Sequence, residues 1–112
     1  MIASTDNESW LIDCGDEIVQ KKAECGLSGL SDWERLVYCL WVADYSIRNA
    51  GDLGAAEDLY EDYRKDLLFF SRELELTKTS EFFALATEFL PEKYEQRFED
   101  ICREVRKAKP NV

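Results

Sequence analysis

Apolar residues recur at spacings of three and four along most of the chain, which is the period of a helix with one buried face. The pattern predicts five helical segments, at about residues 8–25, 31–49, 55–76, 79–90 and 91–109. No stretch alternates apolar and polar residues for long enough to indicate a β-strand. We therefore predict an all-α fold, a compact bundle of about five helices, formed by residues 1–112 as a single acidic helical domain.

The second segment carries the clearest signals. Ser31 and Glu34 match a capping box, in which each side chain satisfies a free backbone donor at the start of a helix. Residues 36–43 are apolar without a break, and a helix that is apolar on all sides belongs in the centre of a fold. Gly26 lies where a left-handed cap would end the first segment. The aromatic residues on the apolar stripes are expected in the core: Trp33, Tyr38, Trp41, Phe70, Phe82, Phe89 and Phe98.

The four cysteines of the chain fall among apolar residues of the expected helices, and no two of them form a CxxC pair: Cys14, Cys25, Cys39 and Cys102. Free cysteine packs as a small hydrophobic residue, and thiols inside the cell stay reduced. We therefore expect reduced thiols in the core. A disulfide or a metal site is the alternative.

The beginning of the chain gives an expectation for its location. The first ten residues include Asp6 and Glu8 and lack the basic and apolar regions of a secretory signal. No run in the sequence approaches the roughly 18 apolar residues that a membrane-spanning helix needs. We therefore expect a cytoplasmic protein that does not use a membrane as a partner.

Charge is distributed unevenly along the chain, which has 24 acidic and 14 basic residues and a net charge of −10. Residues 1–62 hold 14 acidic and 4 basic residues, whereas residues 63–112 hold 10 of each. A negative field repels nucleic acid and anionic membranes and speeds encounter with basic molecules. The charge therefore indicates a basic protein partner and argues against nucleic acid. Solubility alone would explain most of the net charge but not its segregation.

The residues that most enzymes use are missing from the sequence. It contains no histidine, which is the commonest general base near neutral pH and the usual partner of a nucleophilic serine or cysteine. Gly51 and Gly54 do not form a phosphate loop, because the Lys-Ser/Thr pair that must follow such a loop is missing. We expect no catalytic residues, no metal, no cofactor and no enzymatic activity. A small enzyme that uses carboxylates alone is a distant alternative.

Acidic residues crowd the expected start of the third helix and form the candidate partner-binding face: Asp52, Glu57, Asp58, Glu61 and Asp62. A helix dipole stabilises acidic side chains in the first turn only, and Arg64 and Lys65 are placed to pair with the cluster, so an ordinary solvated face is the alternative. Asp44 is a further candidate, because it points from the second helix toward the core or a cleft. A structural ion pair with Arg48, four residues later, is the favoured explanation of Asp44.

Two stretches of the second segment resemble a known family. Residues 30–38, Leu-Ser-Asp-Trp-Glu-Arg-Leu-Val-Tyr, and residues 46–51, Ser-Ile-Arg-Asn-Ala-Gly, are similar to the core signature of the bacterial DNA-mimic-protein family. In this signature a capped helix with a Glu-x-x-x-Tyr pattern ends in an Asn-Gly-Gly-like turn. Asn49 and Gly51 match the turn, Ala50 replaces its first glycine, and the loop that follows is shortened. The resemblance spans about residues 28–90.

The resemblance implies an acidic helical protein that occupies the DNA-binding surface of a transcription or nucleoid protein, and some relatives serve beside toxins as immunity proteins. It also adds Asn49 to the candidate partner-binding residues. The leading hypothesis is therefore a non-enzymatic protein that covers a basic surface of a toxin or of a DNA-binding protein. The alternative is a regulatory or structural homodimer that associates through apolar helix faces. Only an electrostatic complex should lose association rate as salt rises.

Overall fold

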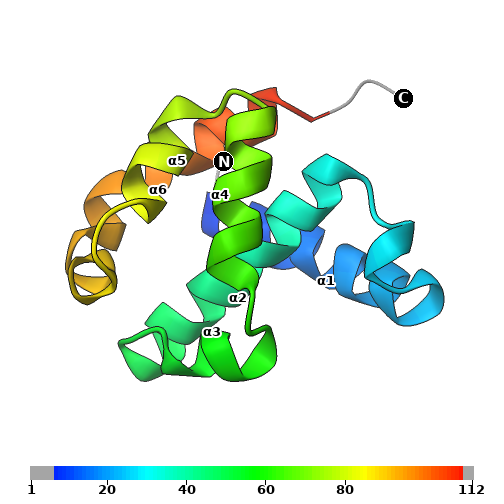
Figure 1. Cartoon of the computed structure of the whole chain (residues 1–112), viewed down its shortest axis with the longest axis horizontal. Helices are drawn as coiled ribbons and strands as arrows, with labels where there is room; N and C mark the ends of the chain where they lie inside the picture. The colour runs from blue at the N-terminus through cyan, green and yellow to red at the C-terminus, as the bar shows by residue number, and fades with distance from the viewer. Residues whose placement is uncertain (1–6, 110–112) are drawn as a thin grey trace.

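Helices make up most of the structure (Figure 1), a computed structural model that describes residues 7–109 apart from the side chain of Thr87. The six α-helices of this range are α1 (Asn7–Cys25), α2 (Asp32–Ala50), α3 (Gly54–Leu59), α4 (Tyr63–Glu73), α5 (Thr77–Phe83) and α6 (Leu90–Lys107). Two 3-10 helices, η2 (Leu27–Gly29) and η3 (Thr87–Phe89), precede α2 and α6, and no strand occurs among the described residues. The predicted all-α bundle is confirmed.

The capping signals predict both ends of α2 correctly, but not the end of α1. The Ser31 amide donates to a Glu34 carboxylate oxygen at 2.8 Å, and the Glu34 amide donates to the Ser31 hydroxyl at 3.2 Å, so the predicted capping box is confirmed. Gly51 ends α2 in the left-handed conformation, with φ 76° and ψ 3°. Gly26 follows α1 with φ 75° but ψ 173°. Its positive φ suits glycine, although the left-handed cap predicted there was wrong.

The central element is α2, which packs against α1, α3 and α4, and Figure 1 shows α4 crossing it in the middle of the molecule. Residues 36–43 are buried with one exception, because the side chain of Trp41 is partly exposed. The central position predicted for this helix is therefore confirmed, whereas Trp41 lies at the edge of the predicted core, packed against it and partly exposed.

Close packing of α1 on α2 depends on a glycine. A Cβ atom at Gly15 would lie 2.2 Å from the Trp41 ring, so a larger residue would force the two helices apart. Glu8 precedes Gly15 by seven residues on α1, and Arg48 follows Trp41 by seven residues on α2. The side chains of Glu8 and Arg48 lie 3.8 Å apart. The two helices are therefore antiparallel. A glycine in the middle of a helix lowers the stability of that helix by about 1 kcal/mol. At Gly15 the missing side chain permits the close contact between α1 and α2.

The predicted third helix is two helices in the structure. The first of them, α3, ends at Leu59, and Tyr60 follows in an extended conformation with φ −156° and ψ 93°. The second, α4, begins at Tyr63 and ends at Glu73. The prediction of one continuous helix to residue 76 was therefore wrong, and the acidic residues around the break lie in a turn as well as on helices.

Contacts of Tyr60 explain why the chain leaves the helix at this point. Its ring packs against the Tyr38 ring of α2, with centroids 5.5 Å apart, and its hydroxyl donates to the Asp66 carboxylate of α4. The same carboxylate oxygen accepts a hydrogen bond from Arg35 at 3.3 Å. Burial and the hydrogen bond to Asp66 raise the pKa of Tyr60. Groups from α2, α4 and the connecting turn are thus held together where the helix breaks.

The helix α5 is shorter than predicted, since it ends at Phe83 instead of continuing to the start of α6. Arg64 of α4 donates to the Phe83 carbonyl at 2.9 Å and also to the Leu85 carbonyl, so its guanidinium satisfies free acceptors at this helix end. Pro91 lies in the first turn of α6, as predicted. Phe89 is 46% exposed in the connection, so its predicted core position was wrong.

The four cysteines are free thiols in two different environments. Cys39 and Cys102 are fully buried, and burial raises the pKa of Cys102 to about 12. Cys14 is partly buried, and Cys25 is exposed at the end of α1. The prediction of core thiols is therefore confirmed for Cys39 and Cys102, whereas Cys14 packs against the edge of the core. It was wrong for Cys25, because the end of α1 lies outside the core.

Candidate protein-interaction surface

Four of the candidate carboxylates lie together where α3 ends and α4 begins, and we call this group the acidic turn: Glu57, Asp58, Glu61 and Asp62. All four side chains are exposed, and none forms an ion pair or a side-chain hydrogen bond with another described residue. Arg64, which was expected to pair with them, directs two of its nitrogens to carbonyl groups at the end of α5. The acidic turn thus presents four negative charges to solvent.

The break between α3 and α4 changes the electrostatic setting of the acidic turn. Glu61 and Asp62 directly precede α4, where a helix dipole stabilises negative charge. Asp58 lies in the last turn of the six-residue α3, where the dipole disfavours negative charge. Glu57 lies in the first turn of α3, so the dipole favours it as the sequence predicted. The helix break changes the expected dipole effect only for the other three carboxylates. Asp62 forms no side-chain cap hydrogen bond, so its carboxylate faces solvent.

Two further candidate residues lie at the opposite end of α3, in and before the turn that follows α2. A carboxylate oxygen of Asp52 accepts from the Gly54 amide at 2.9 Å, and the Asp52 carbonyl accepts from the Ser46 hydroxyl at 2.6 Å. The side-chain amide of Asn49 donates to the Tyr45 carbonyl at 2.9 Å. Asp52 thus shapes the turn, whereas Asn49 bonds within the last turns of α2, and both remain exposed.

Asp44 is 4% exposed, so it is not available for direct contact with a partner. Its Oδ1 atom accepts from Arg48 Nε at 2.9 Å and from the Tyr94 hydroxyl at 2.6 Å. Arg48 also lies 3.0 Å from Glu95 and rests on the Phe98 ring. Burial and the nearby charge of Asp44 raise the pKa of Tyr94. The structural ion pair favoured by the sequence is therefore present within α2, and the Tyr94 hydroxyl and Glu95 join it to α6.

Two carboxylates that the sequence did not connect with this region lie beside α3. Glu88 and Glu92, around the start of α6, line an open hollow of about 460 Å³ together with Asp52 and Glu57. No local pattern signals this proximity, because it depends on how α6 packs. Within residues 7–109, no group of acidic or thiol side chains has the arrangement of a metal site. The hollow extends the acidic surface around α3.

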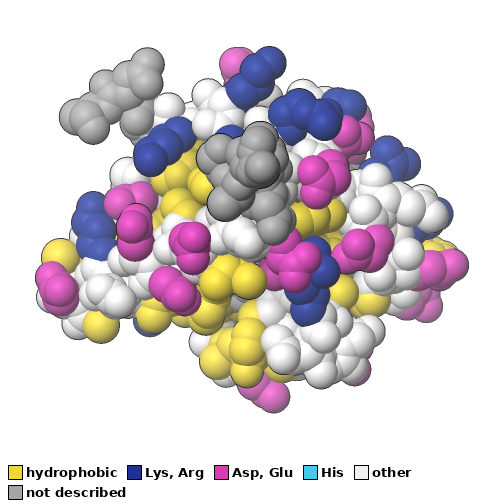
Figure 2. Space-filling model, turned by 180° about the vertical axis from the view of Figure 1, so that it is seen from behind, with side chains coloured by type: hydrophobic (Ala, Val, Ile, Leu, Met, Phe, Trp, Pro, Cys, Tyr) yellow, Lys and Arg dark blue, Asp and Glu magenta, His cyan; other side chains and the backbone are white. Residues whose placement is uncertain are grey.

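A second surface feature is a set of exposed or partly exposed apolar side chains along α2 and its border with α1, which we call the apolar strip: Ile12, Trp41 and Tyr45. Ile12 and Tyr45 are 43% and 46% exposed, and the Trp41 ring stacks on the Tyr45 ring with centroids 6.0 Å apart. Figure 2, a view from behind, shows apolar side chains gathered in its lower middle, with carboxylates above them. The sequence did not predict the strip, because an unbroken apolar run in α2 does not indicate which of its side chains faces solvent.

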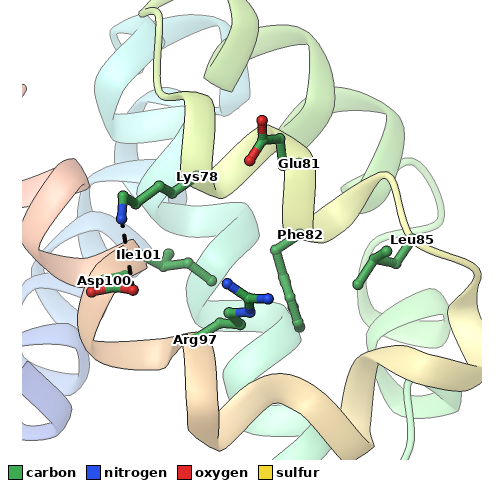
Figure 3. Close-up of a pocket in the computed structure, with 7 residues that line it drawn as sticks. All are labelled: Lys78, Glu81, Phe82, Leu85, Arg97, Asp100 and Ile101. Atoms are coloured by element: carbon green, nitrogen blue, oxygen red, sulfur yellow. Dashed lines mark ion pairs between the residues drawn. The ribbon is translucent and has the colours of Figure 1, made fainter.

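A smaller hollow of about 250 Å³ lies between α5 and α6 (Figure 3). Arg97 points into it between Phe82 and Ile101, and Lys78 reaches Asp100 at 3.8 Å. Two basic and two acidic side chains line this hollow, so their charges offset each other. It therefore lacks the unbalanced charge that distinguishes the acidic turn.

No protein-family model, curated protein sequence or solved structure matches this chain. The resemblance to the DNA-mimic-protein family therefore rests on the residues of α2 and the turn after it. None of the helices described here combines the length and the hydropathy that crossing a membrane requires.

Proposed function

We propose that this protein is a non-enzymatic binding protein whose acidic turn covers a basic surface of a partner protein. The observation that carries the proposal is the presence of four exposed carboxylates within residues 57–62, none of them ion-paired with a described residue. Like charges held this close repel each other, which offsets the stabilisation that the α4 dipole gives to Glu61 and Asp62. A cationic partner would relieve the repulsion and would be steered toward the site.

The partner class that we propose is a toxin or a DNA-binding protein. Both classes often present basic surfaces that recognise phosphate groups, and a cluster of carboxylates offers negative charge to the same surfaces. The resemblance of α2 to the DNA-mimic-protein signature supports this choice. A regulatory or structural homodimer joined through apolar helix faces is the alternative.

Neutralising the acidic turn with Asp58→Asn, Glu61→Gln and Asp62→Asn should weaken partner binding by about tenfold or more, mainly through slower association. The melting temperature should stay within a few degrees, because exposed charges contribute little to folding stability. The partner is first captured from native lysate with the tagged wild-type chain, and its association with each variant is then measured across a salt series. The salt dependence should be flatter for the neutralised variant.

The matched control removes the same charge from exposed residues at the end of α4 and in α5, with Glu73→Gln, Glu75→Gln and Glu81→Gln. Glu104 is not a suitable control, because it accepts two hydrogen bonds from Thr79 at the start of α5. The proposal fails if the control weakens binding as much as the neutralised acidic turn does, or if salt has no effect on association.

A further inference from the structure

The apolar strip lies along an open face of α2. On the helical wheel of α2, Tyr45 and Asn49 lie between Trp41 and Ser46. Trp41 packs against α1, whereas the Ser46 hydroxyl accepts a hydrogen bond from the Ala56 amide of α3 at 3.1 Å. Because Tyr45 and Asn49 are exposed, no described helix covers α2 between α1 and α3.

Ile12 borders this open face from α1. It lies one helical turn before Gly15, which faces Trp41. It also lies one turn after Glu8, which faces Arg48. On α2, Tyr45 lies between Trp41 and Arg48 at the same spacings. The antiparallel register therefore places Ile12 beside Tyr45, and the two exposed side chains continue the surface of the Trp41 ring.

A row of aromatic contacts joins the apolar strip to the acidic turn. The Trp41 ring stacks on Tyr38 at 6.2 Å, and the Tyr38 ring packs on Tyr60 at 5.5 Å, with Lys22 covering Tyr38 from α1. Tyr60 lies between the two acidic pairs of the acidic turn. From Tyr45 to Tyr60 the row extends over roughly three helical turns. The acidic turn and the strip therefore lie within the length of one short helix of a partner, with Lys22 and the buried Tyr38 between them.

Carboxylates lie on two sides of the apolar strip. Asp16 lies one turn after Ile12 on α1, is exposed, and forms no ion pair with a described residue. The acidic turn lies at the far end of the aromatic row. Arg48, beyond Tyr45, is already paired with Asp44. The surface thus combines exposed apolar side chains with negative charge around them.

We infer, on the basis of the proposed function, that the apolar strip and the acidic turn together bind a cationic amphipathic helix of the partner. Apolar residues one turn apart on that helix match the one-turn spacing of Trp41 and Tyr45. Its lysines and arginines meet Asp16 and the acidic turn. A second copy of this chain fits poorly, because a two-fold contact through the strip would oppose two surfaces of the same negative charge.

Two synthetic peptides of about 18 residues, or five helical turns, test this inference with the full chain. Both contain the same lysines and leucines; one has leucine at spacings of three and four, and the other has a scrambled order. The amphipathic peptide should bind at least about tenfold more tightly in calorimetry. The double variant Ile12→Ser, Tyr45→Ser should lose this preference and still bind the scrambled peptide. The control Phe69→Ser, Phe89→Ser, which alters side chains of similar exposure, should keep it.

Each outcome separates the inference from the proposed function. If the two peptides bind equally and neutralising the acidic turn weakens both, the inference that the partner contributes an amphipathic helix is overturned. The proposed electrostatic function then stands. If neutralising the acidic turn does not weaken peptide binding, the proposed function is overturned. If neither peptide binds, both the inference and the proposed function are overturned. Dimerisation of the wild type in sedimentation, abolished by Ile12→Ser and Tyr45→Ser, would assign the strip to a second copy. Circular dichroism verifies that every variant is folded.

Discussion

Replacing Asp44 with alanine should lower the free energy of unfolding by about 1–3 kcal/mol, which is the usual cost of leaving a buried polar group without its hydrogen-bond partner. The carboxylate is almost fully buried and accepts hydrogen bonds from Arg48 and from the Tyr94 hydroxyl. Without it, a hydroxyl in the core and a guanidinium packed on Phe98 both lose an acceptor. Urea denaturation followed by circular dichroism measures the loss.

A milder substitution separates the ion pair from the rest of this network. Tyr94→Phe removes the hydroxyl and leaves Asp44 bonded to Arg48, so it should cost about 1 kcal/mol. If Asp44→Ala were as mild as Tyr94→Phe, the ion pair with Arg48 would add no stability beyond the hydrogen bond from Tyr94. The structural explanation of Asp44 would then be wrong.

Replacing Trp33 with alanine should also destabilise the fold by about 3–5 kcal/mol. Its side chain is only 5% exposed, and its indole N–H donates to the Val105 carbonyl at 2.9 Å. The substitution leaves a cavity between the start of α2 and the end of α6 and removes a hydrogen bond that joins them. The loss is measured by the same denaturation experiment.

Trp41→Ala provides the matched comparison, because it removes the same side chain from a partly exposed site on the same helix. Part of the Trp41 surface already contacts water, so less apolar area is lost and the cost should be clearly smaller than at Trp33. A cost at Trp41 equal to or greater than that at Trp33 would mean that Trp41 belongs to the core and not to a binding surface.

The sequence predicted α2 most accurately, because the signals for this helix are local. The capping box lies within four residues, and the unbroken apolar run is long enough to require burial on most sides. The pairing of Asp44 with Arg48 was also accessible, since a spacing of four places both side chains on one helix face.

The break between α3 and α4 was not accessible in the same way. Apolar residues keep a helical spacing across it, and the residues that stabilise the extended Tyr60 lie far away in sequence or beyond the turn. Tyr38 and Arg35 come from α2, and Asp66 comes from α4. Such contacts exist only after the helices have packed, so periodicity alone cannot reveal them.

The candidate surface was predicted in part. The acidic turn follows from the composition of residues 57–62, although its electrostatic setting depends on the helix break. The apolar strip was missed, because the exposure of Tyr45 depends on which sides of α2 the neighbouring helices cover. Glu88 and Glu92 were missed because α6 brings them to α3 from a distant part of the chain.

The central claim is that the acidic turn contacts a basic partner, and mapping the contact on the wild-type chain tests it most directly. Backbone amide NMR shifts are followed while the captured partner is added at low salt. The account predicts that the largest changes fall on residues 57–62, with further changes at Ile12 and Tyr45, and that they diminish as salt rises. Changes centred on the α5–α6 hollow, with residues 57–62 unaffected, would contradict the account.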